Sequence, residues 1–213
     1  MRHQKTRGNV VLEFALVMAL FLLPMFLFTY AVGFNLLTQL EVVQFTRDAG
    51  HLFVTTQTAF ASTDFIDILD KVGGNTGYPT SAQVYFYRVM YVDTAQCAAG
   101  SPSTCSNANN WVIAQFYKDP AGTKPSGFTP KFGDPTGVGS PDSQGNYSAS
   151  DYISLSGLNI NSAFSTLGIV PYANNPTLGL PSGQTVYVVQ VAATPFNVPG
   201  VTSLTALTDF ACF

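Results

Sequence analysis

The sequence predicts an α+β protein in which a long N-terminal transmembrane helix continues into a small exported domain with an antiparallel sheet. Two observations predict it. Residues 10–40 form an apolar stretch whose only formal charge is Glu13. Beyond it, segments dense in aromatic and β-branched residues alternate with stretches rich in Gly, Pro and Ser, a pattern typical of strands joined by loops. We therefore expect a basic leader at residues 1–8, the long helix at residues 9–60 and an exported α+β domain at residues 61–213.

The apolar stretch is long enough to span a bilayer. A helix over residues 10–40 would be roughly 46 Å long, whereas a hydrocarbon core is ~30 Å thick, and the span is expected at about residues 10–34. Basic residues precede the stretch and mixed charges follow it, so the positive-inside bias places the N-terminus in the cytoplasm and everything after about Leu40 outside. Pro24 is expected to kink the helix or to open one backbone hydrogen bond.

The charge balance argues against nucleic-acid binding. The chain carries 12 acidic and 9 basic residues, for a net charge of −3 and an isoelectric point near 5.1. Arg2, Lys5 and Arg7 lie in the leader, and no basic cluster follows. The domain therefore lacks the Lys/Arg surface that neutralises a phosphate backbone.

Three devices produce such an N-terminal segment, and Glu13 bears on the choice between them. A secretory signal peptide has an apolar core of about 7 to 15 residues before small residues; Ala31-Val32-Gly33 supplies the small residues, but the apolar run before it is too long. A plain anchor has no need of Glu13, although its side chain can snorkel to water at this depth. An ionisable residue in a membrane helix is by default a functional-site hypothesis, which favours a signal cut on the cytoplasmic side.

The residues around Glu13 strengthen that interpretation. Arg7-Gly8 followed by Asn9-Val10-Val11-Leu12-Glu13-Phe14-Ala15-Leu16-Val17 resembles the start of type IV pilin-like proteins, and most of all the TadE-like family of pseudopilins of the tight-adherence (Flp) pilus. The resemblance covers about the first 50 residues. It implies a minor-pilin or pseudopilin subunit of a Tad/Flp-type pilus or related secretion assembly. Such a subunit crosses the bacterial inner membrane once and places its C-terminal domain in the periplasm or outside the cell.

The resemblance also implies processing and partners. Prepilin peptidase cuts after the leader glycine, here between Gly8 and Asn9, which would make Glu13 the fifth residue of the mature chain. The new α-amino group of Asn9 is then a cation that Glu13 of this or a neighbouring subunit can neutralise, which offsets the cost of burying both charges. Such a pair would give register to otherwise slippery apolar helices. The implied partners are the membrane, prepilin peptidase and other pilin-like subunits.

The helix is expected to continue past the membrane. Leu36, Leu40 and Val43 extend an apolar stripe at i, i+4 and i+7, so the helix should run on under the exported domain. Its end is expected between Gly50 and Ala61.

The exported domain is expected to hold a short helix, three strands and a long loop. Ser62 or Thr63 can cap a helix that runs through Lys71. The strands are expected at residues 83–92, 111–117 and 185–192, the first two as a hairpin. Asp119 to Ser150 favours turns and is expected as a surface loop, with an edge strand at Tyr152 to Leu155. The apolar tail at residues 204–213 should pack.

The cysteines fit an exported protein. Cys97 and Cys105 enclose a Gly/Ser/Pro-rich stretch at the tip of the expected hairpin, where they could form a disulfide in an oxidising periplasm. The alternative is two reduced surface thiols. Cys212 is left over and is expected as a small buried apolar residue.

No motif in the chain predicts catalysis, a cofactor, a metal or a small-molecule substrate. His3 and His51 lie on opposite sides of the membrane in this topology, so no site can use both. Asp64, Asp67 and Asp70 share part of a helix face, but the Gly and terminal Glu of a calcium loop are missing. The Gly137-Val138-Gly139 and Gly73-Gly74 segments lack the context of a phosphate loop.

Two other functions stay open at this stage. One is a singly anchored periplasmic binding domain that keeps residues 1–8 and recognises a ligand or envelope protein with its aromatic strands. The other is an exported hydrolase, which would need a pocket lined by converging polar groups.

Overall fold

We describe a computed structural model of the chain over residues 4–55, 82–100, 105–119, 122–166, 185–195 and 206–213. The helix expected between Ser62 and Lys71, with its three aspartates, lies outside these residues, as do Gly73-Gly74 and His3. For residues 4–9 we describe the backbone only.

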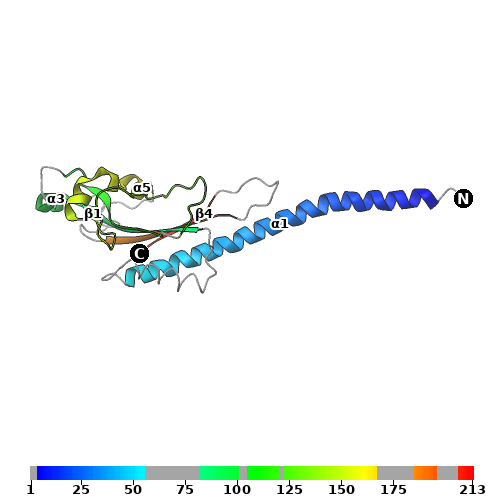
Figure 1. Ribbon diagram of the computed structural model, residues 1–213, viewed down its shortest axis with the longest axis horizontal. Helices are drawn as coiled ribbons and strands as arrows, with labels where there is room; N and C mark the ends of the chain where they lie inside the picture. Colours follow the sequence, from blue (N-terminus) through cyan, green and yellow to red (C-terminus); the bar gives the residue numbers. More distant parts are fainter. Residues whose placement is uncertain (1–3, 56–81, 101–104, 120–121, 167–184, 196–205) are drawn as a thin grey trace.

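A single helix, α1, runs from Gln4 to Thr55 over 52 residues, which corresponds to about 78 Å. It continues through Pro24 and is described as far as Thr55. Figure 1 shows its N-terminal part projecting away from the domain, whereas its C-terminal part runs along the sheet. The long helix followed by an antiparallel sheet confirms the predicted α+β class.

Within the described residues, four antiparallel strands form a sheet in the order β2-β1-β3-β4. They are β1 (Ala82–Val92), β2 (Asn110–Lys118), β3 (Thr185–Ala193) and β4 (Leu207–Cys212). The first three are the predicted strands, and β1 and β2 pair as expected, with a bulge after Arg88. β1 lies between β2 and β3 and is buried on both faces, because successive side chains point to opposite faces and both sets are largely apolar: Val84 and Phe86 pack in one cluster, Tyr85 and Tyr87 in another. The C-terminal tail packs as the edge strand β4, for which its pattern gave no strand signal.

The helix continues past residue 40 along the sheet, as predicted, but the residues that face the sheet are not the apolar stripe from which this was predicted. Leu36 and Leu40 are both 62% exposed. The stripe that faces the sheet is instead Val42, Phe45, Ala49 and Phe53. The apolar stretch has no polar face from which its orientation could be read, and the partner strands decide which side is buried.

The other face of the sheet is covered by turns and short helices. The described part of residues 119–150 is mostly non-helical turn, as expected, but it is more than a surface loop, because Phe132 and Tyr147 are buried against the sheet. The edge strand expected at Tyr152 to Leu155 is wrong. A helix, α4 (Ala149–Ser154), forms there because Ser148 caps it by accepting the Asp151 N–H. The described residues also form the short helices α3 (Thr94–Gly100) and α5 (Asn161–Thr166) and the 3-10 turn η2 (Ser156–Leu158).

Candidate functional site: the exposed apolar helix and its junction with the sheet

The N-terminal part of α1 presents apolar side chains on all sides. Every large apolar side chain from Val10 to Leu40 is 41–73% exposed. The most apolar window has a mean hydropathy of 2.6 and no buried residue. This helix is therefore long and apolar enough to cross a membrane.

Glu13 lies within this apolar segment. Its side chain is exposed beside Leu12, Leu16 and Val17, and it forms no ion pair with any residue in the described part of the chain. The backbone of Gly8 and Asn9 belongs to the same helix. These three residues thus lie within two turns of one another at the N-terminal end of α1.

The junction between α1 and the sheet is a packed apolar interface. Val42, Phe45, Ala49 and Phe53 are at most 2% exposed and pack on β1 and β3. The Phe53 ring contacts Phe86 and Tyr187 edge-on, with centroids 5.2 and 5.0 Å away. Edge-to-face contacts of this kind are favourable because the positive edge of one ring meets the negative face of the other. They help to hold residues 42–53 of α1 against the sheet.

Gly50 allows the helix to approach the C-terminus closely. A Cβ atom at Gly50 would lie 1.9 Å from the Phe213 ring, so a larger residue would displace that ring. Phe213 is joined to β3 by two backbone hydrogen bonds with Tyr187. From the sequence, Gly50 marked only the start of the range in which the helix was expected to end; its contact with Phe213 is long-range and left no local signal.

A cleft of about 500 Å³ opens where α1 meets β4. It is lined by Val43, Arg47 and His51 of α1 and by residues 209–213. Burial raises the pKa of the Asp209 carboxyl, and the Phe210 N–H and the Arg47 guanidinium act against that rise. Sequence analysis did not associate these residues, because β4 was not expected as a strand.

The sequence prediction for Cys212 is wrong. The residue is a free thiol that is exposed, because it lies on an edge strand. Desolvation of the sulfur raises its pKa, while Lys131 acts in the opposite direction. The thiol is therefore protonated at neutral pH and is a weak nucleophile.

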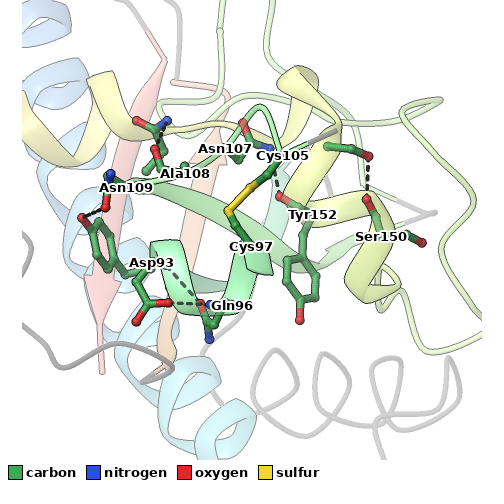
Figure 2. The surroundings of a disulfide bond; sticks show 12 residues. Asp93, Gln96, Cys97, Cys105, Asn107, Ala108, Asn109, Ser150 and Tyr152 are labelled. Atoms are coloured by element: carbon green, nitrogen blue, oxygen red, sulfur yellow. Dashed lines mark hydrogen bonds between the residues drawn. A yellow bond between two sulfur atoms is a disulfide. The ribbon is translucent and has the colours of Figure 1, made fainter. Parts of the chain in front are cut away.

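Cys97 and Cys105 form a disulfide whose Cα atoms are 5.6 Å apart (Figure 2). Cys97 belongs to α3, which replaces a simple hairpin tip and begins with a capping box between Asp93 and Gln96. Beside the disulfide, the fully buried Asn107 donates to the carbonyls of Tyr152 and Leu155 at 2.9 Å. The disulfide closes a loop within the β1–β2 connection, and Asn107 fastens that connection to α4 and its C-terminal cap.

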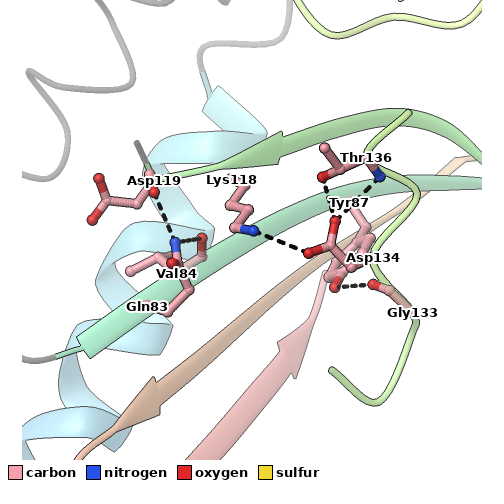
Figure 3. A network of polar contacts seen from close by, with 8 residues as sticks. All are labelled: Gln83, Val84, Tyr87, Lys118, Asp119, Gly133, Asp134 and Thr136. Carbon is pink, nitrogen blue, oxygen red and sulfur yellow. Dashed lines mark hydrogen bonds and ion pairs between the residues drawn. The ribbon is translucent and has the colours of Figure 1, made fainter. Parts of the chain in front are cut away.

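A polar network holds the turn at residues 133–136 against the face of the sheet that is opposite α1 (Figure 3). Lys118 and Asp134 form an ion pair at 3.1 Å, and Thr136 donates to the same carboxylate. Partial burial opposes ionisation of Asp134, but the hydrogen bonds from Thr136 and Lys118 outweigh it and lower its pKa. The buried Tyr87 hydroxyl donates to the Gly133 carbonyl at 2.8 Å, so the turn is tied down at two adjacent residues.

The aromatic residues of β1 belong to the core. Tyr85, Tyr87 and Tyr91 are at most 3% exposed, so they present no binding surface. Among the described residues, no group of three or more His, Cys, Asp or Glu side chains is placed to hold a metal ion.

Comparisons with known proteins assign the chain to no family. No protein-family model, no curated protein and no solved structure matches it.

Proposed function

We propose that this chain is a TadE-like minor pilin or pseudopilin, a structural subunit of a Tad/Flp-type pilus or a related secretion assembly. It is anchored in the bacterial inner membrane with its N-terminus in the cytoplasm. The observation that carries the proposal is the continuous helix α1, which is apolar and exposed over one half and packed under a sheet over the other. This arrangement presents a helix to the membrane and to other subunits from a rigid domain.

The length of the exposed segment supports association between subunits. The helix measures roughly 42 Å from Val10 to Leu37, ahead of the Gln39 side chain that donates a hydrogen bond to the Thr208 carbonyl of β4, and a membrane core accounts for ~30 Å. The remaining apolar turns need another cover, and the helices of neighbouring pilin-like subunits provide one.

Glu13 gives this association its register. The carboxylate has no ion-pair partner in the described chain, and a lone charge in a membrane helix is unfavourable. Cleavage between Gly8 and Asn9 by prepilin peptidase creates an α-amino cation four residues away. The cation of one subunit and the carboxylate of its neighbour then neutralise each other when the helices are aligned.

The first test is the N-terminal residue and intact mass of the protein taken from membranes, with and without active prepilin peptidase. The proposal expects a chain that starts at Asn9 with the enzyme and at Met1 without it. A chain that keeps residues 1–8 in both cases would instead identify a plain anchored domain. A start near Phe34 would identify a secreted protein.

The second test concerns Glu13. In Glu13→Ala, recovery of the subunit with other pilin-like subunits should fall about tenfold or more, as expected for ~1.4 kcal/mol of lost pairing. Glu41→Ala is the matched control, because Glu41 lies on the same helix beyond the exposed apolar segment. Equal recovery of the two variants would remove Glu13 from the mechanism.

A periplasmic binding domain without processing is the second candidate. The aromatic side chains of β1 are buried, so they cannot form the binding surface. The observation that favours a binding domain is instead the cleft between α1 and β4. Retention of residues 1–8 together with normal localisation of Glu13→Ala would support this candidate.

A further inference from the structure

Along β4, the backbone N–H and C=O groups of successive residues point alternately toward β3 and away from it. Phe213 exchanges both backbone hydrogen bonds with Tyr187, and antiparallel pairing alternates from one residue to the next. The N–H and C=O groups of Thr208, Phe210 and Cys212 therefore face outward. The Thr208 carbonyl accepts from Gln39 at 3.5 Å, which agrees with this assignment.

β4 is an edge strand within the described part of the chain, with β3 as its only strand partner. Of its outward groups, the Phe210 N–H faces the Asp209 carboxylate. The Thr208 N–H, the Phe210 carbonyl and both groups of Cys212 have no hydrogen-bond partner among the described residues. An edge with such groups is a template for another strand.

The cleft described above runs along this edge. It is lined by residues 209–213 on one side and by Val43, Arg47 and His51 on the other. Its volume of about 500 Å³ lies in the range of ligand clefts. An added strand would thus be held by the β4 backbone and covered on one face by α1.

Basic side chains flank the edge on both faces of the sheet. Arg47 and His51 line the cleft, and on the opposite face the Lys131 ammonium lies 4.3 Å from the centre of the Phe210 ring. Asp209 is the acid that lines the cleft, and it already faces Arg47. This balance suits a strand that carries carboxylates.

We propose that the outer edge of β4 is a strand-addition site for an extended acidic segment of a partner protein, seated antiparallel to β4 in the cleft against α1. Backbone hydrogen bonds to Thr208, Phe210 and Cys212 hold the segment, and Arg47 and His51 select its acidic side chains. The site goes beyond the association of apolar helices, because it recruits a partner through the exported domain.

A second copy of this chain does not fit the edge, if the proposed anchoring holds. β4 runs from Leu207, near Gln39, to Phe213, beside Gly50, and thus away from the membrane end of α1. Copies anchored in one membrane have parallel β4 strands, whereas a symmetric β4–β4 pair requires opposite directions. A partner segment that returns toward the membrane meets this requirement.

The test uses the full chain in detergent micelles and a synthetic peptide, acetyl-Thr-Val-Glu-Val-Glu-Val-Thr-amide. Hydrogen exchange is followed by NMR and peptide binding by fluorescence anisotropy. Saturating peptide should slow exchange of the Thr208 and Cys212 amides about tenfold or more, as expected for ~1.4 kcal/mol of added protection. The amides of Asp209 and Ala211 should change little, because they already bond to β3.

Two control peptides separate backbone pairing from non-specific adhesion. The same peptide N-methylated at alternate residues lacks the donors that face β4 and should not bind. A peptide with lysine in place of glutamate should bind about tenfold more weakly or worse. Equal binding by the N-methylated peptide would overturn the proposal, as would equal binding by the lysine peptide.

Proline at an outward position removes an edge donor without breaking the β3 ladder. Thr208→Pro and Cys212→Pro should weaken binding about tenfold, whereas Thr208→Ser and Cys212→Ser should bind like the original chain. If the proline variants fail to fold, the N-methylated peptide tests the same donors in the unaltered chain.

Two further results would also overturn the proposal. One is fast exchange of the edge amides with the peptide present. The other is hydrogen exchange of the edge amides that is already slow without peptide and becomes slower as the protein concentration is raised. This result would identify a second copy as the occupant. Neither result depends on cleavage at Gly8, so both are distinguishable from failure of the proposed function.

Discussion

The two halves of α1 belong to one continuous helix and have opposite surroundings. From Val10 to Leu40 the large apolar side chains are exposed on every side, whereas from Val42 to Phe53 a narrow stripe is buried against the sheet. The buried stripe includes Ala49 and adjoins Gly50, which let the helix lie close to β3 and the C-terminus.

The difference shows that hydropathy alone does not assign a helix its partner. The C-terminal half of α1 is held by side chains that pack against β1 and β3. The contribution of each of these side chains to the free energy of unfolding can be tested by substitution. The large apolar side chains of residues 10–40 are exposed, so they should matter little for folding of the domain. Matched substitutions in the two halves test this contrast directly.

The largest effect is expected for Phe53→Ala. The ring is 2% exposed and contacts Phe86 and Tyr187, so its removal leaves a cavity that should cost about 3–5 kcal/mol of the free energy of unfolding. Phe21→Ala is the matched control, since Phe21 is 69% exposed, and it should change domain stability by less than about 0.5 kcal/mol. Urea unfolding of the full chain in micelles measures both. Similar losses in the two variants would mean that the halves are not energetically separate.

Loss of the disulfide should have the next largest effect. Cys97→Ser removes a link between residues eight positions apart, which by loop entropy should destabilise the domain by about 2.5 kcal/mol. Cys212→Ser is the control, because this thiol is free and exposed, and its unfolding curve should not move. Membrane insertion should be unaffected by either change, since both lie in the domain. A stable Cys97→Ser domain would show that Asn107 and the capping box suffice to hold the connection.

Gly50→Ala should give an intermediate effect. The new Cβ would overlap the Phe213 ring, and the displaced ring should cost about 1–3 kcal/mol as overpacking does. At Gly33 nothing lies within 4 Å of the position that an added methyl group would take, so Gly33→Ala should leave domain stability unchanged. Thermal unfolding in micelles compares the two variants. A stabilised Gly50→Ala would show that Phe213 moves aside at no cost and that the helix does not depend on this close approach.

The sequence predicted the elements with a strong local pattern. The long helix, β1, β2 and β3 follow from uninterrupted apolar or alternating side chains. It failed where long-range contacts decide the outcome. Which face of α1 is buried depends on β1 and β3, and the tail forms β4 because β3 offers its free edge. The helix α4 was missed because Tyr152 and Ile153 resemble a strand, although the cap at Ser148 indicates a helix.

The candidate site divides along the same line. Gly8, Asn9 and Glu13 could be proposed because they form a local motif, and their roles stay a prediction. The disulfide could be predicted because Cys97 and Cys105 are close in sequence. The cleft was missed because Arg47 and Asp209 are distant in sequence and meet only through the β3–β4 pairing.

The smallest effects are expected at two acids whose pKa values move in opposite directions. Asp134 has a folded-state pKa below its ordinary 3.8, so its ionised form stabilises the domain above that value and the contribution is lost as pH falls below about 4. Asp209 has a raised pKa, so its ionised form destabilises the domain at neutral pH. We expect Asp134→Asn to lose less than about 1 kcal/mol at pH 7, because the ion pair with Lys118 is partly exposed. Asp209→Asn should gain a similar amount, and both differences should shrink toward pH 3. Urea unfolding at the two pH values measures them, and equal signs for the two variants at pH 7 would contradict the assignment of Asp209 to a desolvated junction between α1 and β4.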